Sequence, residues 1–471
     1  MSVINTNVPS ITAIHQLTAN QNDLKTRLQR LSTGLRINNG RDDPAGLIAS
    51  ETLRSEMRGI SQSVENSQRV INVLSTAEGA LNEISSLLLD VRGLIVHAAN
   101  LGANSNEETQ ADQLQIDSII DSIDRIANTT QFGGQKLING NYEYTTSGIA
   151  VSAITSLTVY GARVPANSYQ NVTVDVTQSA QTAQLVFSAG GGLTDNVTIQ
   201  VTGKIGMEVL SLTSGTGAAG IASAINAVAY TTGVSALASS DNNVYLNSRA
   251  YGSDALVSVK PIDGDFILST GNTSSDRGRD ATVLINGQRA AVNGIEASAR
   301  ANGLDLKLLL TGDRGTRVGT TSFQITGGGA TYQIGPEVNP NGQVSIGIPN
   351  VGSSNLGNAD VGFLYTIKNG ESHAVNAQQT AQAEQIVVEA IQQVAILRGR
   401  LGGLQKNQIE TNINSQNVAL ENVTAAESAI RDADIATEVA AMTRSQILVQ
   451  STTSILGIAN QMPQIALSLL K

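Results

Sequence analysis

The sequence predicts an α+β fold in which the N- and C-terminal segments form a long antiparallel helical bundle or coiled coil, with a β-rich central insert. Two observations carry this prediction. Apolar residues recur with helical spacing at both ends, and the composition is rich in Gly, Ser, Thr, Ala and Val from about residue 145 to about residue 370. Alternating spacings of three and four residues indicate helices, whereas strict alternation indicates strands.

Each end of the chain predicts one long helix with a narrow apolar face. Apolar residues of the first stretch, Pro9 to Ile37, fall on two rows of a heptad repeat: Ile14, Leu17, Leu24, Leu28, Leu31 and Leu35. The stretch from Ile435 to Leu470 repeats this pattern with Ile435, Val439, Met442, Val449 and Leu456. Such a face must be buried against another helix. We expect further helices to cover it, from the same chain or from neighbouring copies.

Further helical patterns lie inside both ends. Between residues 44 and 100, one row is apolar and recurs mostly at seven-residue intervals: Ile60, Leu74, Leu81, Leu88 and Ile95. Pro44 after Asp43 suits a helix start, because an acidic cap and a first-turn proline both fit there. Another helix is expected after a polar break at residues 102–106, because Ile116, Ile119, Ile123 and Ile126 have helical spacing, and such spacing returns at about residue 374. The Asn139-Gly140 pair predicts a short hairpin over residues 135–144.

The insert predicts antiparallel β structure. Val172, Val174 and Val176 alternate with polar residues, and Gly and Asn turns separate this run from similar ones. We expect two small β-rich domains here. The expected division begins with a terminal helix (1–43) and the first part of a helical core (44–145). Two variable β-rich domains follow (146–278 and 279–370), and then the second part of the helical core (371–425) and a second terminal helix (426–471).

Composition excludes several classes of function. The net charge of -10 argues against a nucleic-acid partner, which would require a basic face. The absence of cysteine excludes disulfides and thiolate sites. The sequence contains no run of about 18 apolar residues, so no membrane-spanning helix is expected. The N-terminus lacks a basic segment followed by an apolar core, so no cleavable secretory signal is expected.

No catalytic, metal or cofactor site is expected. The stretch from Gly215 to Gly220 fits the G-x-G-x-x-G dinucleotide pattern, with Asp241 about twenty residues further on. Its surroundings predict antiparallel strands rather than parallel βαβ units, which argues against a nucleotide site. The three histidines, His15, His97 and His373, have no paired ligand spacing.

Long motifs at both ends strongly resemble bacterial flagellin. In the N-terminal part they are Leu31–Asn38, Asp42–Leu47 and Thr130–Leu137. In the C-terminal part they are Ala436–Val439, Ser445–Leu448, Ala459–Gln464 and Leu469–Lys471. The resemblance covers roughly residues 1–140 and 375–471. It implies a structural subunit, not an enzyme, that polymerises into the bacterial flagellar filament for motility.

The resemblance also implies locations and partners. The terminal helices, 1–43 and 426–471, would form the inner tubes of a homopolymer outside the cell, with the β-rich domains facing solvent. The chain would be exported unfolded, without a cleaved signal peptide. Its partners would be the flagellar export apparatus, a flagellin export chaperone, and the filament cap and junction proteins.

One stretch resembles the site that the innate Toll-like receptor for flagellin recognises, but it is degenerate. The family has Gln-Arg-Val-Arg-Glu-Leu-Ala-Val-Gln where this chain has Leu89 to His97. Arg92 and Leu94 match. Asp90 reverses the charge of the first arginine and Gly93 removes the glutamate. We therefore expect weak or no receptor activation.

Other classes of function fit parts of the sequence. A hook–filament junction protein shares the terminal patterns, although the full C-terminal motif and the large insert favour the filament subunit. An NAD-binding insert is the remaining enzyme option. A secreted adhesin is a third class, and an adhesive insert is compatible with the filament reading.

Overall fold

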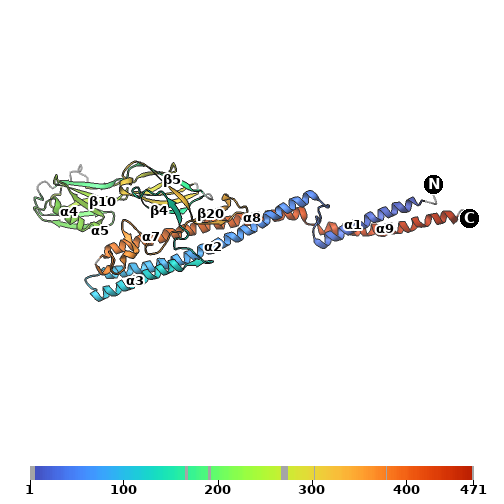
Figure 1. Ribbon diagram of the computed structural model, residues 1–471, viewed down its shortest axis with the longest axis horizontal. Coiled ribbons are helices and arrows are strands. Elements are labelled where there is room, and N and C mark those ends of the chain that lie inside the picture. The colour runs from blue at the N-terminus through green and yellow to red at the C-terminus, as the bar shows by residue number, and fades with distance from the viewer. Residues whose placement is uncertain are drawn as a thin grey trace. The chain divides into compact units, whose positions relative to one another are not determined.

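The computed structural model describes residues 6–164, 168–188, 192–266, 274–301, 303–377 and 379–468. The described chain runs through three helices, a long β-rich region and three further helices (Figure 1). It divides into two compact units. The first comprises Met1–Gln68, Gln333–Gly342 and Glu410–Lys471, and the second comprises Arg69–Tyr332 and Gln343–Ile409. The last residues of the C-terminal motif, Leu469 to Lys471, lie outside the described residues.

The N-terminal helices begin where the sequence provides caps. Their bounds are α1 Val8–Thr33, α2 Pro44–Ala98 and α3 Asn106–Thr129. Asp43 Oδ1 accepts a hydrogen bond from the Gly46 amide at 2.9 Å, so the acidic cap before Pro44 is confirmed. Ser105 and Glu108 form a capping box at the start of α3.

The C-terminal part is almost continuously helical. Its elements are α7 Thr380–Leu404, the π-helix η4 Gln405–Glu410, α8 Thr411–Arg431 and α9 Ile435–Ser468. In the second unit the predicted row on α2 is confirmed: Leu74, Leu81, Leu88 and Ile95 are each at most 1% exposed. Arg92 and Glu78 of α2 reach Glu384 and Arg398 of α7 with ion pairs of 3.1 and 3.2 Å. The expected helical core therefore forms from both ends of the chain.

The predicted hairpin over residues 135–144 is wrong in its position. The antiparallel pair consists of β1 Gln131–Phe132 and β2 Gln135–Lys136. Gly133 and Gly134 make the turn, with φ values of 59° and 82°. Glycine adopts such positive φ angles without the steric cost that other residues meet. Gly140 also has a positive φ, of 94°, but the strands before and after it, β2 and β3 (Tyr144–Ser147), do not pair with each other.

The first β domain is discontinuous in sequence. Its helix is α6 Gly312–Gly315, and its strands are β3 Tyr144–Ser147, β4 Ile154–Gly161, β5 Gln170–Gln178, β13 Thr282–Ile285, β14 Gln288–Arg289, β15 Ala291–Asn293, β16 Glu296–Ala301, β17 Leu304–Leu310 and β18 Gly319–Gly328. They form two antiparallel sheets, ordered β14-β13-β5-β18-β3 and β15-β16-β17-β4. Side chains from both sequence segments share one apolar core.

The second β domain is inserted into the first. Its elements are β6 Thr182–Ser188, β7 Val197–Gly203, β8 Met207–Leu212, α4 Ala218–Ala227, α5 Ala229–Thr232, β9 Val234–Ala238, β10 Asn243–Tyr251, β11 Leu256–Asp263 and β12 Ser275–Arg277. Two antiparallel sheets, β6-β10-β9 and β12-β11-β7-β8, enclose its own core with α4. The sequence analysis expected a domain boundary near residue 279. The structure has a second boundary, near residue 181, which was not predicted.

Shorter elements connect the β region to the helices. They are β19 Ala330–Gln333, the 3-10 helix η1 Pro340–Gly342, β20 Gln343–Ile346, β21 Gly357–Asn358, β22 Gly362–Phe363, and the 3-10 helices η2 Leu364–Ile367 and η3 Val375–Ala377. Asp124 of α3 accepts hydrogen bonds from the amide and hydroxyl of Ser353, both at 2.7 Å. Gln113 donates to the Ile367 carbonyl at 2.9 Å. These contacts attach the segment before residue 370 to the helical core rather than to a β domain.

Candidate functional site: the paired terminal helices

Helices α1 and α9 lie side by side and antiparallel within the first unit (Figure 1). Polar contacts join them along their length. The Ser10 hydroxyl donates to Asn460 Oδ1 at 2.7 Å near one end, and the Ser445 hydroxyl donates to Asp23 Oδ2 at 2.5 Å further along. As the residue number rises on one helix, the number of its partner falls on the other. A single antiparallel register therefore satisfies these contacts.

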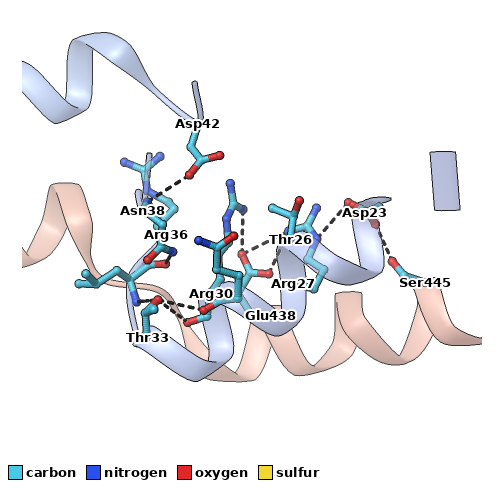
Figure 2. A network of polar contacts seen from close by, with 12 residues as sticks. Asp23, Thr26, Arg27, Arg30, Thr33, Arg36, Asn38, Asp42, Glu438 and Ser445 are labelled. Carbon is cyan, nitrogen blue, oxygen red and sulfur yellow. Dashed lines mark hydrogen bonds and ion pairs between the residues drawn. The ribbon is translucent and has the colours of Figure 1, made fainter. Parts of the chain in front are cut away.

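We call the polar contacts between α1 and α9 the polar seam. Its charged centre is Glu438 of α9. Arg27 Nη1 and Arg30 Nη1 approach its two carboxylate oxygens at 3.0 and 3.1 Å (Figure 2). The Glu438 side chain is 8% exposed, whereas the two arginines keep 27% and 19% of their side chains accessible. Burial raises the pKa of Glu438, but the hydrogen bonds from Arg27 and Arg30 outweigh it and hold this pKa below its usual range.

The C-terminal end of α1 is tied to the turn before α9. Gly34 caps α1 with φ 72°, a conformation that glycine adopts at little cost. Its carbonyl accepts from the Ala433 amide at 2.9 Å. The Arg36 guanidinium donates from Nη2 and Nε to the Ile430 carbonyl at 2.5 and 3.2 Å. The N-terminal motif that contains Gly34 and Arg36 thus shapes the connection between the helices.

Apolar residues of the pair are largely left uncovered. Among the apolar side chains described on α1 and α9, those buried are Ala13 and Ala459, at 7% and 5% exposure. The predicted assembly residues divide into two groups. Half-buried positions are Leu17, Leu24, Leu31, Leu35, Met442, Val449 and Leu456. Exposed positions are Ile14, Leu28, Ile435 and Val439.

Sequence reasoning missed further exposed apolar residues on the same two helices. They are Val8, Ile11, Ile447, Leu448, Ile455, Ile458 and Met462, which are 41–64% exposed. Monomeric proteins rarely leave so many large apolar side chains in contact with water along one element. The strict heptad rows overlooked them because the apolar face of each helix is broader than two rows. The polar seam was missed as well, since isolated charges on a helix usually indicate a solvated face.

The receptor-like stretch lies on α2 in the second unit. Asp90 and Gly93 are exposed, Leu94 is half-buried, and Arg92 is engaged by Glu384 of α7. His97 Nδ1 lies 2.7 Å from Asp112 Oδ2 of α3. The hydrogen bond with this carboxylate raises the pKa of His97.

The glycine-rich stretch at residues 215–220 has a structural role. Gly217 is the N-cap residue of α4, and the strand that precedes it, β8, pairs antiparallel with β7. Dinucleotide sites require a parallel βαβ unit at this point. The described residues contain no cluster of three or more His, Cys, Asp or Glu side chains that could hold a metal ion. No helix among them is both long and apolar enough to cross a bilayer.

Together, the helices from both ends, the uncovered apolar faces and the β-rich middle are typical of a structural protein rather than an enzyme. Comparison with known proteins identifies the family. A family model described as the bacterial flagellin N-terminal helical region matches residues 4–143, and one described as the bacterial flagellin C-terminal helical region matches residues 385–470.

Curated relatives match over the whole chain. Flagellin of Salmonella muenchen is 30% identical, with 100% of this chain and 99% of the relative covered. Flagellin of Bacillus subtilis (strain 168) is 26% identical, with 99% of each covered. The chain belongs to the bacterial flagellin family, whose members are structural subunits of the extracellular flagellar filament rather than enzymes. The junction-protein alternative is not better supported.

Solved structures give weaker likenesses. A flagellar hook associated protein-3 from Legionella pneumophila is 13% identical, with 81% of this chain and 98% of that chain covered and a TM-score of 0.31. A flagellar cap protein fragment from Escherichia coli is 17% identical, with 39% and 97% covered and a TM-score of 0.27. At these TM-scores the likenesses carry no argument about this chain.

Proposed function

We propose that this flagellin polymerises through the apolar faces of α1 and α9, which neighbouring copies cover in the filament. One observation carries the proposal: among the described residues, exposed large apolar side chains are concentrated on the paired helices, where they include Ile14, Leu28, Ile435 and Val439, whereas the others are spread over many elements. Burial of each large aliphatic side chain yields about 1.5–3 kcal/mol. Several such side chains per copy supply the free energy of a stable interface.

The polar seam has a complementary role in this proposal. Contacts through Glu438, Asp23 and Asn460 fix how α1 pairs with α9 within a copy, and so keep the apolar side chains for contacts between copies. Polar groups inside a helix pair specify register at some cost in stability. The residues at 1–43 and 426–471 thus act as assembly helices, and repeated head-to-tail contact builds an open polymer.

We also propose that the chain is exported before it assembles. The chain leaves the cell through the flagellar export apparatus without cleavage of a signal peptide. Inside the cell, an export chaperone covers the apolar faces of the terminal helices, which would otherwise associate prematurely. An open polymer also has an uncovered helix surface at each end. Junction and cap proteins cover these two surfaces.

The receptor-like stretch supports weak or no activation of the innate Toll-like receptor. Asp90 presents a negative charge where the family has arginine, and Gly93 presents no side chain where the family has glutamate. Arg92 is drawn to Glu384 at 3.1 Å. A cell reporter assay tests this, with the double variant Asp90→Arg, Gly93→Glu expected to give the stronger response. A full-strength response to the unaltered chain would refute it.

Negative-stain electron microscopy tests the polymerisation proposal. Full-length protein is seeded or salted out beside a chain truncated after Val423 and beside the variants Leu24→Asp and Leu456→Asp. We expect long uniform filaments from the full-length chain alone, with the circular dichroism of the β insert retained in every variant. Filaments from the truncated chain, or from either aspartate variant, would show that the terminal helices are not the polymer contact.

A further inference from the structure

A cavity of about 310 Å³ lies where the chain passes between the two β domains of the second unit. The polar and charged side chains that line it are Gln178, Ser253, Arg279, Asp280, Thr282 and Arg289. Two segments cross at this point, one leading from β5 into β6 and the other from β12 into β13. Gln181 and Arg279 exchange backbone hydrogen bonds of 2.8 and 3.0 Å between these segments, so the wall of the cavity is fixed.

The cavity is locally cationic in a chain of net charge -10. Asp280 is its one lining carboxylate, and that carboxylate is already engaged. It accepts from the Gly294 amide at 2.7 Å, from the Ser253 amide at 3.0 Å and from the Ser253 hydroxyl at 2.6 Å. These bonds tie the segment between β12 and β13 to the turns at Ser253 and Gly294. The two arginines therefore set the charge that a ligand in the cavity meets.

Both guanidinium groups have N–H donors that make no hydrogen bond with another described residue. Among the described residues, Arg279 donates from Nη2 to the Ser179 carbonyl at 3.3 Å. Arg289 is exposed on β14, and its side chain makes no hydrogen bond or ion pair with another described residue. A guanidinium presents its N–H groups as a planar fork that matches the two oxygens of a carboxylate. An anionic oxygen pair is the group that this lining recognises best.

The remaining lining suits a ring that carries hydroxyl groups. Thr282 donates its hydroxyl to Gln178 Oε1 at 3.1 Å, which leaves the amide N–H groups of Gln178 and the Thr282 oxygen available to a ligand. Ala281, Ala290 and Val292 form apolar wall beside them. Small-molecule sites occupy about 300–1,000 Å³, so this cavity lies at the lower end of that range and suits a ligand of the size of a single sugar ring.

We propose that this cavity binds an acidic sugar, a monosaccharide-sized ring whose carboxylate pairs with Arg289 and Arg279. The site gives the insert a carbohydrate-binding activity that is independent of filament assembly. It fits the uronic-acid residues of acidic polysaccharides, with the carboxylate held by the arginines and the ring hydroxyls held by Gln178 and Thr282.

Saturation-transfer NMR and calorimetry on the full-length monomer test the site. The probes are D-glucuronate, D-glucose and acetate. We expect saturable binding of glucuronate, with glucose and acetate at least about tenfold weaker, because each lacks one half of the contacts. Arg289→Gln is expected to weaken glucuronate binding about tenfold through loss of a charge-assisted hydrogen bond. Arg317→Gln removes another exposed arginine, which lies outside the cavity, and should leave glucuronate binding unchanged.

Three results would overturn the proposal. Glucuronate that shows no saturable binding would remove the site, and unchanged affinity in Arg289→Gln would place binding elsewhere. Acetate or glucose that binds as well as glucuronate would remove the acidic-sugar assignment. Because Arg289 is exposed and unpaired among the described residues, its substitution should leave the unfolding temperature unchanged. The assay needs no filaments, so its result is separate from the polymerisation proposal.

Discussion

The β insert and the terminal helices use apolar residues in opposite ways. In the insert, alternate residues of a strand point into a closed core, and Val172, Val174 and Val176 of β5 are each 0% exposed. On α1 and α9, polar side chains such as Ser10, Asp23 and Glu438 join the two helices, while Leu28 and Ile455 are 51% and 52% exposed. The insert completes its core inside one copy. The terminal helices do not.

In the helix pair, the contacts that determine orientation are therefore different from those that supply most of the stability. The contacts of Glu438 with Arg27 and Arg30 orient α1 against α9, yet ion pairs that are partly exposed contribute little net stability. Most stabilisation of these helices must come from apolar burial against other copies. We therefore propose that the β domains are stable before assembly and that the terminal helices gain most of their order on joining the filament.

The largest expected effect comes from charging an exposed apolar position of α1. Leu28→Asp places a carboxylate where a neighbouring copy must exclude water, and we expect polymerisation to be abolished while the monomer stays folded. Sedimentation of assembled protein measures this. Gln29→Asp adds the same charge at the next, already polar position and should leave most assembly intact. Equal losses in both variants would contradict a contact that depends on the apolar face.

A core substitution in the insert should destabilise a β domain but leave filament assembly intact. Leu246 of β10 is 0% exposed, and Leu246→Ala is expected to destabilise the second β domain by about 2–5 kcal/mol. Calorimetry should show the lowered transition, while filaments still form. Leu237→Ala on the neighbouring strand β9 removes a side chain that is 66% exposed and should shift the transition little. Loss of filaments in Leu246→Ala would mean that the insert and the assembly helices are not independent.

Reversing the charge at the centre of the seam should give a smaller effect. Glu438→Arg faces Arg27 and Arg30 with a like charge, and the lost contacts cost about 1.5–3 kcal/mol. We expect the critical concentration for polymerisation to rise. Adding Arg27→Glu and Arg30→Glu should restore it, because the swapped charges pair again. Glu421→Arg, on the exposed side of α8, is the matched control. The account fails if the triple variant assembles no better than the single one.

The smallest expected effect concerns the contact between α2 and α3. The hydrogen bond to Asp112 raises the pKa of His97 above 6.5. Stabilisation by the protonated pair is therefore complete below pH 6.5 and is lost as the pH rises through the raised pKa. An NMR titration of the His97 imidazole should show the raised midpoint, and Asp112→Asn should return it to the ordinary value. A midpoint that is the same in both proteins would refute the pairing.

Local patterns predicted the helices well and the seam poorly. The buried row of α2 could be read from the sequence because Leu74, Leu81 and Leu88 meet one continuous helical core. Arg27 and Arg30 are three residues apart and so share a helix face. Their partner Glu438 could be recognised only once the antiparallel register was known.

The insert shows the same limit for strands. Alternation located β5, yet it could not show that β4 pairs with β17, because the paired residues Leu157 and Leu308 are far apart in sequence. Strand register depends on such distant partners. For this reason the two β domains were expected as consecutive segments, 146–278 and 279–370, although the second domain interrupts the first.

Hydrogen exchange on monomer and filament tests the central claim most directly. The account predicts that amides of α1 and α9 exchange rapidly in the monomer and are strongly protected in the filament, whereas amides of β5 and β10 are equally protected in both. Equal and high protection of α1 and α9 in the monomer would contradict it, because the terminal helices would then be complete without their neighbours.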